Sequence, residues 1–262
     1  MIDEGKIVEF ARELVVAEEE RKPIDPITER AELSIEDAYK IQLEIIEMKK
    51  RRGEKVIGKK IGLTSKRMQQ ALGLYQPDYG HIIDKMIIGD GSPISLSELI
   101  QPKIEVEIAF ILKEELTGPG ATAAGVLRCT MGLLPAFEVI DSRIKDWKIK
   151  IQDTIADNAS IGRVILGSPL SNVYGIDLRS VGVVVRKNGE VIETAAGAAV
   201  SGNPVESVAW LVNKLSEHDV HLKAGEIVLS GSLIAPIEIK EGDVIQAEFG
   251  CGLGTITTYV RK

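Results

Sequence analysis

The sequence predicts an α+β protein in which a helical N-terminal third packs on a larger, strand-rich body. Apolar residues recur at helical spacing in residues 3–20 and again after residue 34. Two apolar runs, at 101–112 and 133–141, read as strands, and from Val181 onward the pattern is mostly β. Because no shift in composition marks a linker, we treat residues 1–262 as a single unit. We expect a helical subdomain at 1–75 and the strand-rich body at 76–262.

The overall charge and the cysteine content exclude several classes of protein. With 32 basic and 39 acidic residues the net charge is -7, which argues against a nucleic-acid or anionic-membrane partner. No run of about 18 apolar residues suggests a membrane span, and no signal-peptide pattern opens the chain, so we expect a cytoplasmic protein. Cys129 and Cys251 are too few for a disulfide framework.

The N-terminal third contains clear helix boundaries. Pro23 ends the amphipathic helix expected at 3–20. Ser34 and Asp37 form a capping-box pattern at the start of a second helix, and Gly53 is placed to cap its C-terminus.

A short strand at 56–64 follows, and it contains two glycines and two adjacent lysines. Glycine inside a strand often marks close approach of backbone or ligand. Lys60 is therefore either a surface lysine with a buried stem or a charge aimed at an anionic ligand. The next segment, 76–80, reads as a turn-rich loop with Asp78 at its centre, and Asp in a turn is by itself a weak functional signal.

The most informative stretch contains three glutamates on two expected strands, 101–112 and 133–141. Side chains alternate along a strand, so Glu105 and Glu107 project from one side while apolar residues fill the other. Glu138 stands alone in the second apolar run, where an ionised carboxylate is costly to bury unless it is compensated.

A divalent cation would compensate these carboxylates. Oxygen ligands suit magnesium or manganese better than zinc, and the three His and two Cys form no cluster with ligand spacing. The alternative for Glu105 and Glu107 is a solvated outer face of an antiparallel strand. That alternative does not account for Glu138.

The remaining expected elements follow from local patterns. Residues 142–160 are polar enough to form an active-site loop. The other expectations are a helix at 121–132, strands at 181–186 and 190–194 joined by a type I′ turn at Asn188-Gly189, a helix beginning at Asn203 and Pro204, and strands near 226–231, 243–249 and 254–260.

The order of motifs resembles the 2-keto-4-pentenoate hydratase family, which includes 2-oxo-hept-4-ene-1,7-dioate hydratase and 4-oxalocrotonate decarboxylase and belongs to the fumarylacetoacetate hydrolase superfamily. The resemblance runs from about residue 35 to the C-terminus. It implies a mixed β-roll or sandwich fold. The motifs that carry it are GKKIGLTS at 58–65, QPDYG at 76–80, PKIEVE at 102–107, PAFEVIDSR at 135–143 and DNAS at 157–160.

The resemblance also implies roles for the acidic residues. Glu105, Glu107 and Glu138 would bind a divalent metal, Mg²⁺ or Mn²⁺, that is chelated by the 1-carboxylate and 2-oxo oxygen of the substrate. The reaction would be addition of water to a 2-hydroxy-2,4-dienoate to give a 4-hydroxy-2-oxo acid, in meta-cleavage aromatic catabolism. The resemblance also suggests a homo-oligomer, or a complex with a related decarboxylase or hydratase.

Four further residues receive roles in the same way. Lys60 would hold the substrate carboxylate or enolate oxygen, and Asp78 would be the general acid/base. Ser160 would bind the substrate carboxylate, with Asp157 shaping its loop. Decarboxylase relatives tend to carry an apolar residue in place of Asp78, which favours a hydratase.

Three alternatives remain open from the sequence. The first is a 4-oxalocrotonate decarboxylase, since it would use the same metal site. The second is a non-catalytic partner subunit, although the retained acids argue against a silent scaffold. The third is a hydrolase, for which His81 is the candidate base beside the Asp78 segment, while a hydrogen-bonded structural histidine is the simpler interpretation.

Overall fold

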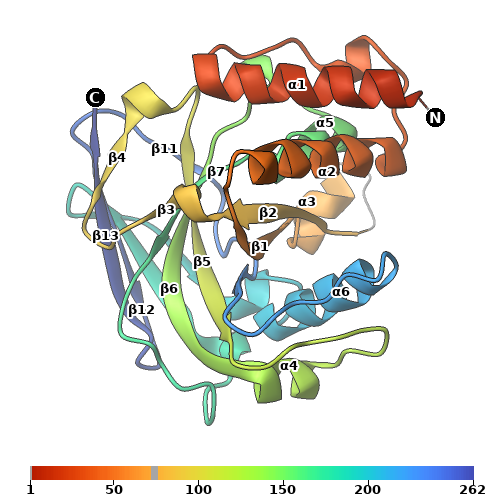
Figure 1. Ribbon diagram of the computed structural model, residues 1–262. Helices are drawn as coiled ribbons and strands as arrows, with labels where there is room; N and C mark the ends of the chain where they lie inside the picture. The colour runs from red at the N-terminus through yellow and green to blue at the C-terminus, as the bar shows by residue number, and fades with distance from the viewer. Residues whose placement is uncertain (1, 72–75) are drawn as a thin grey trace.

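A computed structural model describes residues 2–71 and 76–262 and contains two β-sheets flanked by helices (Figure 1). The larger sheet has the strand order β2-β1-β10-β5-β6-β7-β3, with β11 paired to β5. The smaller sheet has the order β4-β13-β12-β8-β9. In Figure 1, α1 and α2 cover one end of the larger sheet and α4 and α6 lie at the other. This arrangement confirms the α+β prediction.

The strands and helices have the following bounds. The larger sheet comprises β1 (Val56–Gly62), β2 (Asp78–Ile83), β3 (Ile87–Ile88), β5 (Lys103–Leu112), β6 (Thr130–Ile140), β7 (Ile161–Leu166), β10 (Ile227–Leu229) and β11 (Ile237–Glu238). The smaller sheet comprises β4 (Pro93–Ser95), β8 (Gly182–Lys187), β9 (Glu190–Ala196), β12 (Val244–Phe249) and β13 (Gly254–Arg261). The helices are α1 (Glu4–Glu20), α2 (Ile35–Arg51), α3 (Lys66–Ala71), α4 (Ala123–Cys129), α5 (Ile151–Ala156) and α6 (Pro204–Ser216).

Local sequence signals account for several of these boundaries. The Ser34 hydroxyl accepts from the Asp37 amide at 3.0 Å, and the Asp37 carboxylate accepts from the Ser34 amide at 3.1 Å, which confirms the capping box of α2. Asn188 and Gly189 both have positive φ, as a type I′ hairpin requires, and they join β8 to β9. Asn203 caps α6, in which proline occupies the first turn.

The structure corrects several sequence-based boundaries: the helix expected at 121–132 ends at Cys129, directly before β6 begins, and two further corrections concern the site. Asp78 is the buried first residue of β2, so the segment expected to be a turn-rich loop becomes a strand at that residue. The segment 142–160, expected to be a polar loop, contains α5 and is buried at Asp153, Asp157 and Ser160. In both places the sequence suggests that polar side chains face solvent, whereas the structure buries them.

Strand β1 lies inside the larger sheet, parallel to β10 and antiparallel to β2. The range 1–75 therefore contributes a strand of this sheet as well as helices, and the division at residue 75 remains a prediction. Among the described residues, no helix is both long and apolar enough to span a membrane.

The two faces of β5 differ in chemistry, and this difference positions the site. Ile104, Val106 and Ile108 are fully buried in the main hydrophobic core on one face. Glu105 and Glu107 project from the opposite face, as the alternation predicts. That second face is therefore the one on which polar chemistry gathers.

Candidate active site

Three carboxylates converge on the polar face of the larger sheet. Glu105 on β5 is the register partner of Glu138 on β6, and Glu107 lies two residues further along the same face. Each of these glutamates offers an oxygen within 4.8 Å of the others. Glu107 is 0% exposed, so the alternative of a solvated outer face is wrong for Glu107, while Glu105 on the same face is half-buried.

The donor set and its unmet valence fit a hard divalent cation. Glu107 Oε2 accepts from the Gly231 amide at 2.7 Å, whereas Glu107 Oε1 and Glu138 Oε2 have no partner among the described residues, and Glu138 Oε1 has only the Lys60 ammonium at 3.0 Å. Burial, followed by the charge of Glu138, raises the pKa of Glu105 to about 8 and raises the pKa of Glu107 as well. Oxygen ligands at this spacing are typical of magnesium, manganese or calcium sites.

Lys60 on β1 reaches the same cluster from three strands away, on the same face of the sheet. Its Nζ lies 3.0 Å from Glu138 Oε1, so these two long side chains reach toward each other across the intervening strands. Burial opposes the ammonium charge, but Glu138 and the neighbouring carboxylates outweigh it and raise the pKa of Lys60.

Asp78 is a buried acid without a hydrogen-bond partner beside Lys60. It pairs with Gly62 across β2 and β1, and a Cβ atom at Gly62 would lie 2.1 Å from Asp78 Oδ1. Neither carboxylate oxygen of Asp78 accepts a hydrogen bond among the residues described. Burial raises the pKa of Asp78, and the charge of Lys60 only partly opposes that effect. Glycine at position 62 thus leaves the space in which the acid lies.

Asp157 and Ser160 belong to a tightly bonded turn that adjoins β2. The Ser160 hydroxyl donates to Asp157 Oδ2 at 3.1 Å, and the Arg143 Nε donates to Asp157 Oδ1 at 2.5 Å. The proximity of Asp157 raises the pKa of the buried Arg143 guanidinium despite its desolvation. Ser160 therefore has its hydroxyl proton engaged within the protein, and its oxygen remains an acceptor.

Arg143 is a residue that sequence reasoning left without a role. It donates five hydrogen bonds, four from the guanidinium and one from its backbone amide, although it is only 5% exposed. The available signal was a charged residue in the DSR motif directly after an apolar strand. Gly231 was likewise not singled out, although its amide donates to a predicted metal ligand.

His81 does not lie with the carboxylates. Its Nδ1 is 3.0 Å from Gln42 Oε1, and the Gln42 amide nitrogen donates to the carbonyl oxygens of Tyr79 and Ile155. Because that amide group donates through its nitrogen, its oxygen is free to accept from the His81 Nδ1 proton. Burial also lowers the pKa of the His81 imidazole, which favours its neutral form. These contacts favour the structural interpretation of His81 over a hydrolytic base.

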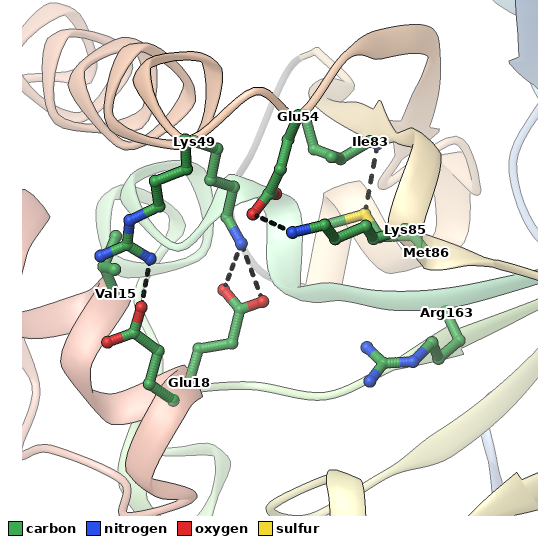
Figure 2. Close-up of a pocket in the computed structure, with 10 residues that line it drawn as sticks. Val15, Glu18, Lys49, Glu54, Ile83, Lys85, Met86 and Arg163 are labelled. Carbon is green, nitrogen blue, oxygen red and sulfur yellow. Dashed lines mark hydrogen bonds and ion pairs between the residues drawn. The ribbon is translucent and has the colours of Figure 1, made fainter.

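A separate surface cleft of about 190 Å³ lies between α1, α2 and β7 (Figure 2). Lys49 Nζ contacts both oxygens of Glu18 at 2.8 Å, and Lys85 Nζ lies 3.1 Å from Glu54 Oε1. Arg52 pairs with Glu19 as well, so each acidic group in this cleft has a cationic partner, and Arg163 pairs with Glu98 outside it. None of the seven predicted site residues lines it.

Comparison with known proteins places this geometry in a family. Residues 67–261 match the fumarylacetoacetate (FAA) hydrolase C-terminal family. The chain is 49% identical to a 2-hydroxypent-2,4-dienoate hydratase of Pseudomonas putida over 221 residues, which cover 84% of this chain and 100% of the relative. It is 44% identical to a 2-hydroxyhexa-2,4-dienoate hydratase of Comamonas testosteroni, with 93% of each chain covered.

A solved structure has the same fold over nearly the whole chain. The 4-oxalocrotonate decarboxylase from Pseudomonas putida G7, complexed with magnesium and adipate, superposes with a TM-score of 0.96 at 37% identity and covers 99% of both chains. The sequence match, the shared fold and the clustered carboxylates agree: this chain belongs to the fumarylacetoacetate hydrolase family.

Proposed function

We propose that this chain is a divalent-metal-dependent hydratase, a lyase that adds water to a 2-hydroxy-2,4-dienoate to give a 4-hydroxy-2-oxo acid. The observation that carries the proposal is the enclosure of Asp78, a buried acid whose carboxylate has no hydrogen-bond partner among the described residues, beside Lys60 and three clustered glutamates. A buried carboxyl group of this kind favours its protonated form, and so it can deliver a proton inside the site. The names of the hydratase relatives at 49% and 44% identity support the same reaction.

The protein groups divide the chemistry as follows. A cation held by Glu105, Glu107 and Glu138 would supply Lewis-acid polarisation of the 2-oxo acid. Lys60 would bind the substrate carboxylate or the enolate oxygen. Ser160 would contact the carboxylate through its oxygen or its backbone, with Asp157 holding the turn in place.

Asp78 would move the proton. In the first step the acid gives its proton to the far carbon of the dienol, the 2-hydroxyl releases its proton to bulk water, and an α,β-unsaturated 2-oxo acid results. In the second step the Asp78 carboxylate takes a proton from the water whose oxygen adds at C4, which regenerates the acid, and C3 takes one proton from bulk water. Burial raises the pKa of Asp78, which favours the protonated acid that this step requires.

The side chains that share the sheet face with the carboxylates are apolar, which supports a substrate with a short, uncharged tail. Strand register places Ala109, Ala136, Val164 and Leu229 on the same face as the glutamates. A dicarboxylate would need a second cation. Among the side chains that the structure describes, Lys60 is the one cation in ion-pair contact with these glutamates.

A decarboxylase is the second candidate, because the decarboxylase from Pseudomonas putida G7 has the same fold. The test is to supply 2-hydroxypenta-2,4-dienoate with Mg²⁺ or Mn²⁺ and to follow both dienol absorbance and 4-hydroxy-2-oxopentanoate. In parallel, 2-oxo-3-hexenedioate is supplied and carbon dioxide is measured. Loss of dienol without the hydroxy acid rejects hydration, and absence of carbon dioxide rejects decarboxylation.

The Glu107→Gln variant tests whether the carboxylate cluster is the site. We expect it to lose both metal binding and turnover. Survival of turnover without metal binding would place the chemistry elsewhere. We further expect a cytoplasmic homo-oligomer, which sedimentation of the purified protein would test, and a comparison of Mg²⁺ with Mn²⁺ would identify the better activator.

A further inference from the structure

The turn at Asn158–Ser160 has a costly backbone conformation. Its three residues, Asn158, Ala159 and Ser160, have φ values of 50°, 50° and 56°. Non-glycine residues adopt this left-handed region as single residues and rarely as a run, because Cβ approaches the following carbonyl. Such a run persists only where surrounding contacts over-determine it, and these runs gather at functional sites.

One guanidinium brackets this turn. Arg143 Nη2 donates to the Asp157 carbonyl before the turn at 2.5 Å, and Nη1 donates to the Ile161 carbonyl after it at 2.8 Å. The same side chain donates through Nε to the Asp157 carboxylate at 2.5 Å. The planar fork of arginine matches this set of acceptors, and the point charge of lysine does not.

Asn158 in this turn is hydrogen-bonded to the outer edge of β2. Asn158 Oδ1 accepts from the His81 amide at 2.8 Å, and Asn158 Nδ2 donates to the His81 carbonyl at 3.0 Å. This side chain thus pairs with the strand as a neighbouring strand would. The contact is close, since a Cβ atom at Gly80 would lie 2.6 Å from the Asn158 carbonyl oxygen. Asp78 is the first residue of that same strand.

We propose that Arg143 is a positioning residue, which acts through the left-handed turn and Asn158 to hold β2 and so to set Asp78 against Lys60. The proposal rests on the hydratase function for its kinetic consequence. Asp78 has no hydrogen-bond partner of its own among the described residues, so its place depends on the backbone that carries it. An edge strand without this pairing would leave that backbone freer to shift.

Two variants test whether Arg143 and Asn158 position β2, and a third variant controls for a general loss of stability. Arg143→Lys keeps the charge but cannot bracket the turn. Asn158→Gly keeps the Arg143 and Asp157 pair, relieves the backbone strain, and removes only the amide that pairs with His81. Asp243→Asn is the control, because it removes a buried carboxylate that pairs with Lys187 in the smaller sheet, away from β2.

For both positioning variants we expect kcat to fall about 10²-fold, the loss typical of a displacement near 1 Å, with KM and Mn²⁺ affinity close to wild type. The double variant should lose no more than either single variant, because both act on one path. The His81 amide, followed by hydrogen exchange, should exchange faster in both. Asp243→Asn should lower the melting temperature and leave kcat and the His81 amide unchanged.

Wild-type kcat in Arg143→Lys and Asn158→Gly, measured below their unfolding transitions, overturns the positioning role. Additive losses in the double variant, or an unchanged His81 amide, overturn it as well. If Arg143→Lys does not fold, Asn158→Gly decides alone. If the wild type shows no hydration, the proposed function fails, and the exchange of the His81 amide still tests whether this network holds β2.

Discussion

Neutralising one buried glutamate should stabilise the metal-free protein while it removes metal binding. Glu105 has a folded pKa of about 8 against an ordinary value of 4.5. At pH 7 the folded state therefore retains a proton that the unfolded state has released. Retaining this proton lowers the free energy of unfolding of the wild type at pH 7, and Glu105→Gln does not have this penalty.

The magnitude follows from the pKa difference. Between pH 4.5 and pH 7 the penalty grows by 1.36 kcal/mol per unit, which gives about 3 kcal/mol as an upper bound. Because Glu105 is half-buried and its charge is coupled to the neighbouring carboxylates, we expect about 2 kcal/mol, or roughly 4–8 °C in melting temperature. The sign is fixed: a raised acid pKa makes the wild type lose stability as pH rises from 4.5 toward 8.

The assay is thermal and chemical unfolding of both proteins after chelator treatment, at several pH values. The stability difference should vanish below about pH 4 and reach a plateau above pH 8, as the pKa limits require. Titration with Mn²⁺ should show a loss of affinity greater than the roughly 10- to 100-fold caused by altering an outer-shell partner. Glu190→Gln, on the exposed strand β9, is the matched control and should change neither quantity.

Equal stability of Glu105→Gln and wild type across this pH range would mean that the carboxylates do not share one desolvated site. Unchanged Mn²⁺ affinity would remove Glu105 from the ligand set. Either result refutes the reasoning from the buried cluster.

The remaining predictions concern Asp78, the space that Gly62 leaves for its carboxylate, and the bound metal. Asp78→Asn should lower kcat about 10²- to 10⁴-fold, as for loss of a general acid, with Mn²⁺ affinity retained; near-wild-type turnover in a stopped-flow assay would remove Asp78 from the proton transfer. Gly62→Ala should displace the Asp78 carboxylate, because the new methyl would lie 2.1 Å from Oδ1, and so should lower kcat with the metal still bound; unchanged kcat would show that Asp78 tolerates the shift. Mn²⁺ at 100 times its dissociation constant should raise the free energy of unfolding by about 2.7 kcal/mol in a thermal-shift experiment, and Glu107→Gln should abolish that gain.

Local sequence signals predicted the elements whose cause is local. The capping box at Ser34, the Asn188-Gly189 turn and the proline at the start of α6 each act within a few residues, and each is present in the structure. The alternation around Glu105 and Glu107 likewise depends only on the strand itself. These features could be predicted because no distant segment was needed to produce them.

The rest depended on contacts between distant segments. The sequence left Asp78 in a loop because Pro and Asp usually make turns, whereas its strand exists through pairing with β1 and with Asn158, which is 80 residues later. Arg143 and Gly231 gained their roles from partners that only the folded chain supplies. The meeting of Lys60 with Glu138 depends on the order of the strands in the sheet, which no local pattern encodes.

The protonation of Asp78 connects the charge of the site to its substrate. With a divalent cation bound, the three glutamates would carry three negative charges and Lys60 with the cation three positive charges, so the site would be neutral only while Asp78 holds its proton. An ionised Asp78 would add a negative charge and oppose the approach of an anionic dienoate. Burial, which raises the pKa of this acid, would therefore favour substrate binding as well as the proton donation proposed for Asp78. A substrate with two carboxylates would meet this balance less well than one with a single carboxylate.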